Sequence, residues 1–125
     1  MKDAPFGPSS VSIDKSSIDI CTYSNYFKFM QFEWDENKNR SNLAKHNLSF
    51  QAATEVFFSI CLTAADTRTD YGEKRWISVG EISPHTVIVV VYTIRGEKYR
   101  IISARKANDR ERRKYYEHIR GPKET

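Results

Sequence analysis

The sequence predicts an α+β domain in which helices pack against one face of an antiparallel sheet. Helical signals lie at both ends of the compact part of the chain, and four short alternating or β-branched segments lie between them. The chain has 125 residues, of which 39% are hydrophobic and 29% are charged, as in an ordinary globular domain with a modest core. We therefore expect two N-terminal helices, a four-stranded antiparallel sheet and a C-terminal helix, in that order.

Residues 1–29 differ in composition from the rest of the chain. They contain Pro5, Gly7 and Pro8 and a scatter of serines, and no period of 2 or 3.6 residues persists in them. Segments of this kind bury too little apolar surface to order themselves. We therefore expect a disordered N-terminal extension over 1–29 and one compact domain over 30–125.

Two helices are expected at the start of the compact domain. Asp35 is a good N-cap for a helix over about 36–46, and Asn47 suits the left-handed position that ends a helix. Ser49 can cap a second helix over about 50–58, whose apolar residues recur at helical spacing.

The alternating segments that follow predict the sheet. A polar, flexible segment over 66–74 separates the first two strands, and Gly96 marks the last turn. The third segment is rich in valine, which is typical of a central strand. Strands are expected over 60–65, 75–82, 86–94 and 98–105.

The last strand leads directly into a basic helix. Simple alternation puts Arg105 on one face of the strand with Ile101 and Ser103, and it puts Arg100 on the other face. Asn108 can cap the helix, and Glu111 at the third helical position can complete a capping box. One helix face carries Arg112, Tyr115, Tyr116 and Ile119, and the opposite face carries Arg110, Arg113, Lys114 and Glu117.

The charge distribution favours an acidic partner. The net charge is +4 and the sequence pI is about 9.1. In residues 1–29 the three lysines and three aspartates cancel, so the excess lies in residues 30–125, mostly in the last strand and helix. This asymmetry is typical of a polyanion-binding protein. On charge alone, a solvated basic helix face is an equally good interpretation.

Cysteine usage and hydropathy predict a cytoplasmic protein. Cys21 and Cys61 are far apart and have no metal-ligand or redox spacing, which indicates a reducing compartment. No apolar run approaches the roughly 20 residues that a membrane span needs. No group of His, Cys, Asp and Glu has ligand spacing, so we expect no metal and no other cofactor.

Several separated motifs, in order, give the chain a family resemblance. They are FEWDENK, then N-LAKH-LSF, then RWISVG, then IISARKA followed by ERRKYYE. Together they resemble the BrnT family of bacterial type II toxins over about residues 30–117. The chain departs from the family pattern in residues 1–29 and in Asn47, where the family more often has glycine, although asparagine tolerates the left-handed conformation.

The resemblance implies a function that composition and periodicity do not. It implies a small RelE-like ribonuclease toxin that cleaves RNA without a bound metal and is neutralised by a BrnA-like ribbon-helix-helix antitoxin. It also implies that the toxin–antitoxin complex represses its own operon, with the antitoxin contacting the operator DNA.

Metal-free RNA cleavage uses the ribose 2′-hydroxyl as nucleophile and needs acid–base groups and fixed cations. Five residues fit these roles: Arg105, Arg75, Glu73, His46 and Lys45. Each has a structural alternative. Arg105 could form an ion pair that closes the sheet edge, Glu73 could be a solubilising surface charge, and a histidine in the last helical turn is favoured by the helix dipole alone.

A second set of residues suits contact with RNA through stacking or phosphate binding. This set is Arg100, Tyr92, Arg110, Arg113 and Tyr115. The same features would also suit a non-catalytic nucleic-acid-binding module, a protein that only sequesters a DNA-binding partner, or an inactive toxin that still binds its antitoxin.

Overall fold

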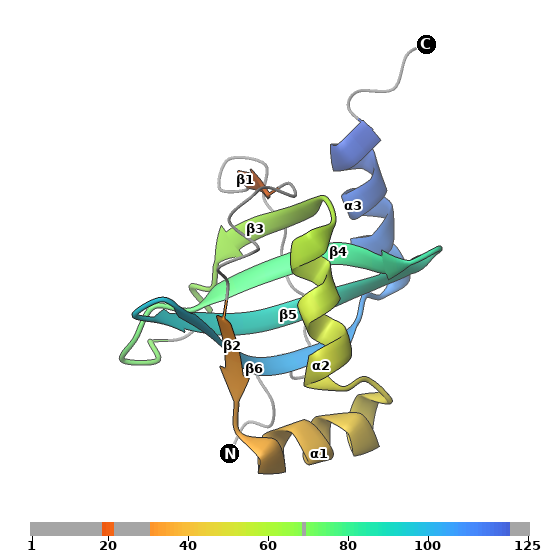
Figure 1. Ribbon diagram of the computed structural model, residues 1–125. Coiled ribbons are helices and arrows are strands. Elements are labelled where there is room, and N and C mark those ends of the chain that lie inside the picture. Colours follow the sequence, from red (N-terminus) through yellow and green to blue (C-terminus); the bar gives the residue numbers. More distant parts are fainter. Residues whose placement is uncertain (1–18, 22–30, 69, 121–125) are drawn as a thin grey trace.

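The computed structural model describes residues 19–21, 31–68 and 70–120, and it places them in one mixed sheet with helices on both faces (Figure 1). The strand order is β1-β3-β4-β5-β6-β2. In chain order the elements are β1 (Asp19–Cys21), β2 (Gln31–Trp34), α1 (Glu36–His46), α2 (Phe50–Ala53), the 3₁₀ helix η3 (Thr54–Phe58), β3 (Cys61–Ala65), β4 (Trp76–Ser83), β5 (Thr86–Arg95), β6 (Lys98–Lys106) and α3 (Asp109–Arg120).

The helix ends are formed by the residues that the sequence indicates. The Asp35 carboxylate accepts a hydrogen bond from the Asn37 amide at 2.8 Å, and Asn47 has a φ of 55°. Ser49 Oγ accepts from the Ala52 amide at 3.0 Å. The expected helix over 50–58 is one short α-helix, α2, that continues as η3.

The sheet is larger than the predicted four strands. The antiparallel meander β3–β4–β5–β6 is confirmed. An additional strand, β2, pairs in parallel with β6, and β1 pairs antiparallel with β3. The four residues of β2 alternate polar and apolar, but the pairing with β6 joins residues 67 positions apart, which no local pattern indicates. Three residues of the segment expected to be disordered form β1, and the rest of 1–29 lies outside the described residues.

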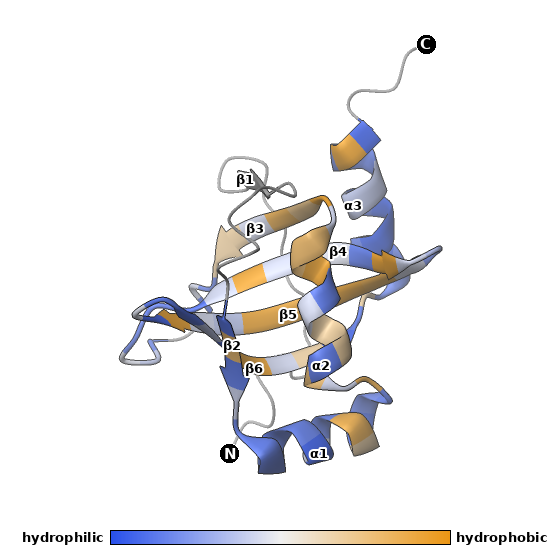
Figure 2. Ribbon diagram, in the orientation of Figure 1, coloured by the Kyte–Doolittle hydropathy of each residue, from blue (hydrophilic) through white to orange (hydrophobic). Residues whose placement is uncertain are grey.

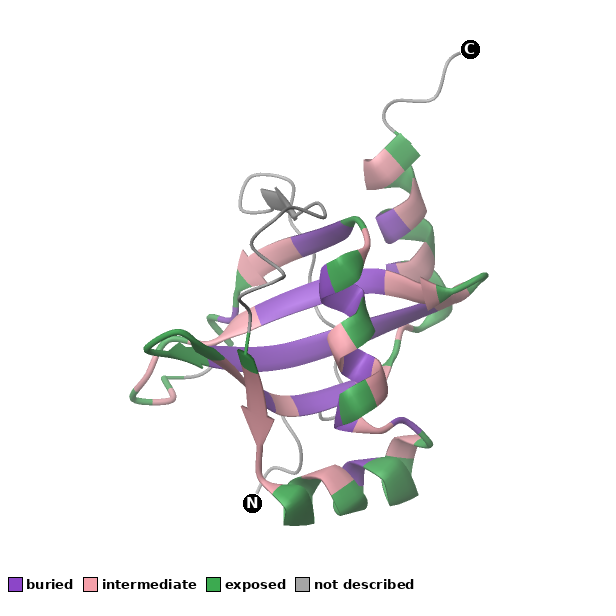
Figure 3. Ribbon diagram, in the orientation of Figure 1, coloured by how far each residue is buried: buried purple, intermediate pink, exposed green. Residues whose placement is uncertain are grey.

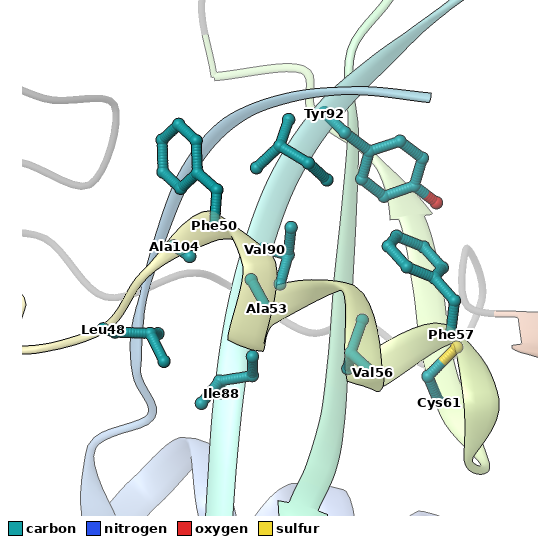
Figure 4. Close-up of a cluster of buried hydrophobic side chains, with 11 residues drawn as sticks. Leu48, Phe50, Ala53, Val56, Phe57, Cys61, Ile88, Val90, Tyr92 and Ala104 are labelled. Carbon is teal, nitrogen blue, oxygen red and sulfur yellow. The ribbon is translucent and has the colours of Figure 1, made fainter. Parts of the chain in front are cut away.

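The sheet has an apolar cluster on each face. Figure 2 shows apolar residues concentrated on the central strands and polar ones along α1 and much of α3. Figure 3 shows that the middle of β5 is buried. Its valines pack alternately into the apolar clusters on the two faces of the sheet. On one face, α2 and η3 cover Ile88, Val90 and Tyr92 (Figure 4). On the other face, Tyr115 of α3 packs with Val89.

Gly80 permits the close contact between η3 and β4. A Cβ atom at this position would lie 2.5 Å from Cγ2 of Val56. Val56 is fully buried, so it has little room to move away. Any side chain at residue 80 would therefore push η3 off the sheet.

A β-bulge in β6 changes which side chains share a face. Val91 pairs with Ser103, but Tyr92 pairs with Ile101, so Ile102 is an extra residue. Ile101 therefore faces α2, whereas Arg100, Ser103 and Arg105 all face the α3 side. The prediction from simple alternation was wrong for Ile101 and Arg100, because one inserted residue reverses the alternation before it.

Candidate functional site

The side chain of Asn42 attaches α1 to the edge of β6. Its Nδ2 atom donates to the carbonyl oxygens of Leu48 (2.9 Å) and Ala104 (2.7 Å), and its Oδ1 atom accepts from the Ala104 amide (3.3 Å). Because β2 pairs with β6 only as far as Ile101, the Asn42 amide replaces a neighbouring strand for Ala104. The last turn of α1 is thereby fixed beside the end of β6.

This attachment brings Lys45 and His46 toward Arg105. The pKa of His46 is lowered from its usual value, first by partial burial and then by the positive charges of Lys45 and Arg105. A histidine in this setting is neutral at pH 7 and can accept a proton. Three of the five predicted catalytic residues are therefore neighbours, although they come from two elements.

Glu111 holds the guanidinium of Arg105. Nη1 of Arg105 donates to Oε1 of Glu111 at 2.8 Å, and Nη2 donates to Oε2 at 2.8 Å. The Glu111 carboxylate also accepts from the Asn108 amide at 2.9 Å, while Asn108 Oδ1 accepts from the Glu111 amide at 2.8 Å. The predicted capping box is confirmed, and the ion-pair alternative for Arg105 is also present. The pair is mostly buried, with 13% of the Arg105 side chain and 2% of the Glu111 side chain exposed.

Glu73 and Arg75 lie in a second cluster, at the start of β4. Glu73 stands between two arginines, with its Oε2 atom 3.6 Å from Nε of Arg75 and its Oε1 atom 3.3 Å from Nη2 of Arg95. The guanidinium of Arg75 also lies 4.1 Å from the ring centroid of Tyr71. The geometry is that of a surface ion-pair group beside a loop.

The loop before β4 is anchored by buried Asp66. Its carboxylate accepts hydrogen bonds from Arg68 at 2.8 and 2.9 Å and from the Tyr71 hydroxyl at 3.1 Å. Burial raises the pKa of Asp66, but the hydrogen bonds from Arg68 and Tyr71 outweigh it, so the net pKa is lowered. These bonds position Tyr71 and, through it, Arg75.

The two clusters lie at opposite ends of β6. Arg105 is in register with Val89 of β5, whereas Arg75 immediately precedes Trp76, which is in register with Tyr92. Four strand positions therefore separate their rows, or about 13 Å along the sheet. The structure brings Arg105, His46 and Lys45 together and does not bring Glu73 and Arg75 to them.

Residues 34–111 match the family described as "Ribonuclease toxin, BrnT, of type II toxin-antitoxin system". The matched segment is more than half of the 125-residue chain. The chain belongs to the BrnT family. It is also similar to the solved structure of the Brucella abortus ribonuclease toxin BrnT, with 29% identity over 64% of this chain and 99% of that chain, and a TM-score of 0.51. No curated protein sequence matches it.

BrnT membership gives the chain its general function, that of a ribonuclease toxin of a type II toxin–antitoxin system, with RNA as substrate and an antitoxin as partner. The resemblance inferred from the sequence motifs is confirmed. The matched segment contains both clusters and ends at residue 111, within the first turn of α3.

In this BrnT chain, the predicted RNA-binding residues divide into exposed cations and buried tyrosines. Arg110 and Arg113 are exposed on α3. Tyr92 is 4% exposed, and its hydroxyl lies 2.9 Å from Ser78 Oγ. Tyr115 is 2% exposed, and its hydroxyl donates to the Ile60 carbonyl at 2.6 Å. Base stacking therefore does not fit Tyr92 or Tyr115, since packing against the sheet occupies both rings.

Two residues of the first cluster were absent from the predicted site. Asn42 was not among the predicted site residues, and Glu111 was assigned only to the capping box. The signal for Glu111 is its place six residues after Arg105, where the strand turns into the helix. No sequence signal indicates that Asn42 bonds Ala104, because the two residues are 62 positions apart.

The described residues contain no group of three or more His, Cys, Asp or Glu side chains arranged to hold a metal ion. Within the same part of the chain, no helix is both long and apolar enough to cross a membrane.

We expect Asn42→Ala to lower the free energy of unfolding by about 1–3 kcal/mol, because it leaves the buried polar groups of Ala104 and Leu48 without partners. It should also raise the pKa of His46 toward its usual value, since α1 would no longer be held near Arg105. Urea unfolding and an NMR titration of His46 measure both effects. Asn37→Ala, on the exposed side of α1, is the matched control. An unchanged His46 titration in Asn42→Ala would show that Asn42 does not position the cluster.

Proposed function

We propose that this BrnT-family toxin cleaves RNA where α1, β6 and the start of α3 meet, using His46, Lys45 and Arg105. One observation carries the proposal: a histidine with a lowered pKa lies close to an arginine whose guanidinium is held by two hydrogen bonds to Glu111. A neutral base beside a fixed cation is what attack by a 2′-hydroxyl requires.

The cleavage proceeds by transfer of two protons. His46 removes the proton from the ribose 2′-hydroxyl, and the 2′-oxygen forms a bond to the adjacent phosphorus. The bond between phosphorus and the 5′-oxygen breaks, and the Lys45 ammonium protonates the departing 5′-oxygen. The upstream RNA fragment then ends in a 2′,3′-cyclic phosphate. Arg105 stabilises the negative charge on the phosphorane-like transition state. Because Glu111 fixes its guanidinium, little reorganisation is needed during the reaction.

The proposal extends to the RNA contacts, the cellular location and the antitoxin of this protein. Arg110 and Arg113, exposed on α3, contact RNA phosphates. The toxin acts in the cytoplasm, a BrnA-like ribbon-helix-helix antitoxin neutralises it, and the complex represses its operon through the antitoxin. RNA cleavage requires no metal, since His46 and Lys45 supply the acid–base groups. Glu73 and Arg75 take no part in the chemical step, because they lie at the far end of β6.

The test is cleavage of an end-labelled RNA by the purified protein in EDTA, beside the Arg105→Lys variant. We expect the wild type to produce fragments ending in a 2′,3′-cyclic phosphate, and the variant to be slower by about 10²–10³-fold, because lysine cannot reproduce the paired hydrogen bonds to Glu111. Cleavage that stops in EDTA and returns with a divalent cation would contradict the metal-free mechanism. RNA binding without cleavage by the wild type would indicate a non-catalytic binding module or an inactive toxin.

A further inference from the structure

The β6 bulge gathers cations at the end of the sheet that lies away from His46. On β6, Lys98 pairs with Arg95 of β5 and Arg100 pairs with Thr93, so both cations face the α3 side. Arg95 and Arg75 face the same side, because the carboxylate of Glu73 lies within 3.3 Å of one and 3.6 Å of the other. We call the four cations Arg75, Arg95, Lys98 and Arg100 the basic patch.

The basic patch has more positive charge than its carboxylates neutralise. Arg75 and Arg95 share Glu73, and Arg100 lies 3.4 Å from Glu33 of β2. Four cations against these two carboxylates leave a surplus of two positive charges. Lys98 is exposed, as is 55% of the Arg95 side chain, so the surplus is accessible to a ligand. These ion pairs are partly exposed to solvent, and such pairs can exchange a carboxylate for a phosphate.

The basic patch shares a face with the proposed cleavage cluster. Arg100, Ser103 and Arg105 follow one another along the same side of β6, and the rows of Arg100 and Arg105 are about 13 Å apart along the sheet. Ser103, between them, is 6% exposed, and its hydroxyl has no hydrogen-bond partner in the part of the chain that the structure describes. Because Ser103 is buried, an RNA strand does not contact β6 at this point, and a strand bound at Arg105 reaches the basic patch by passing over the atoms that cover Ser103. An acidic segment of a protein could bind the basic patch alone, so the shared face with the cleavage cluster favours RNA as the ligand.

We infer that the basic patch binds an RNA phosphate at least one nucleotide away from the scissile one, so that this BrnT protein holds its substrate at two places on one face of the sheet. This inference rests on the proposed cleavage site. The patch contributes affinity for longer RNA and takes no part in the chemical step.

The test measures binding of a 12-nucleotide RNA in which every 2′-hydroxyl is methylated, so that binding does not depend on cleavage. Fluorescence anisotropy is recorded for Arg100→Ala and Glu33→Gln over a range of salt concentrations. We expect Arg100→Ala to weaken binding about tenfold, as for the loss of one charge-assisted hydrogen bond. Its plot of log affinity against log salt should be less steep by about 0.7, the value for one lost contact to single-stranded nucleic acid. Glu33→Gln should strengthen binding, because it frees Arg100 from its carboxylate.

The two variants are expected to change RNA affinity in opposite directions, which distinguishes a direct contact between Arg100 and RNA from a purely structural role. If Arg100 only secures β2 to β6, both variants weaken binding together, which overturns the inference. Unchanged RNA affinity in Arg100→Ala also overturns it, and weaker capture of the antitoxin by that variant would assign the patch to the protein partner. Arg40→Ala, which removes an equal charge from an exposed position on α1, should bind like the wild type. Failure of the proposed cleavage is distinguishable, since the wild type would then bind this RNA but not cut the unmodified one.

Discussion

Replacing Glu111 with alanine is expected to lower the free energy of unfolding by about 3–5 kcal/mol, because it leaves the mostly buried Arg105 guanidinium without its carboxylate. The substitution also removes the acceptor for the Asn108 amide, so the first turn of α3 loses half of its capping box. RNA cleavage should fall with stability, since Arg105 would no longer be fixed beside His46. Urea unfolding and RNA cleavage by the folded fraction measure the two effects.

A double variant separates stability from function. Arg105→Met with Glu111→Gln removes both charges but keeps an acceptor for the Asn108 amide, because glutamine also forms capping boxes. A buried ion pair replaced as a unit is often neutral for stability, so this protein should unfold near the wild-type urea concentration. It should nevertheless remain inactive. If the double variant cleaved RNA at the wild-type rate, Arg105 would have no role in the reaction.

Replacing His46 with glutamine is expected to slow RNA cleavage by roughly 10²–10⁴-fold, the usual contribution of a general acid or base. His46 lies half-buried in the last turn of α1, outside the buried core clusters of the described residues, so the variant should fold normally. The direction of the pH dependence follows from the lowered pKa. A base must be unprotonated, so kcat/KM of the wild type should rise with pH through the His46 pKa, below its usual value of about 6.5, and then level off.

Lys45→Gln is a second test of this pH dependence, in which kcat/KM should also fall, because Lys45 is the proposed general acid. The positive charge of Lys45 is one cause of the lowered His46 pKa, so its removal should move the acidic limb of the kcat/KM profile to higher pH. The same shift should appear in an NMR titration of His46. An acidic limb that persists in His46→Gln would show that another group is the base.

The local features of the fold could be predicted from the sequence. Asp35, Asn47, Ser49 and the Asn108–Glu111 capping box all act where their residue types indicate. These features depend on atoms within a few residues of one another, so sequence spacing is sufficient to predict them. The meander β3–β6 could be predicted for the same reason, since each of its strands follows its neighbour along the chain.

Features that join distant parts of the chain could not be predicted in this way. The parallel pairing of β2 with β6, and the bonds between Asn42 and Ala104, join residues that no local pattern relates. The bulge at Ile102 is a mismatch between two strands, and it alone decides that Arg100 faces the same side as Arg105.

By itself, then, the sequence determined the family, the helix caps, the central meander and the residue types that a ribonuclease site needs. The tertiary structure decided which of these residues meet. It joined Lys45 and His46 to Arg105, gave Arg105 a buried partner in Glu111, placed Glu73 and Arg75 about 13 Å away along the sheet, and buried Tyr92 and Tyr115. The physical reason is that caps and turns are set by local backbone geometry, whereas a site is set by strand register and side-chain packing across the sheet.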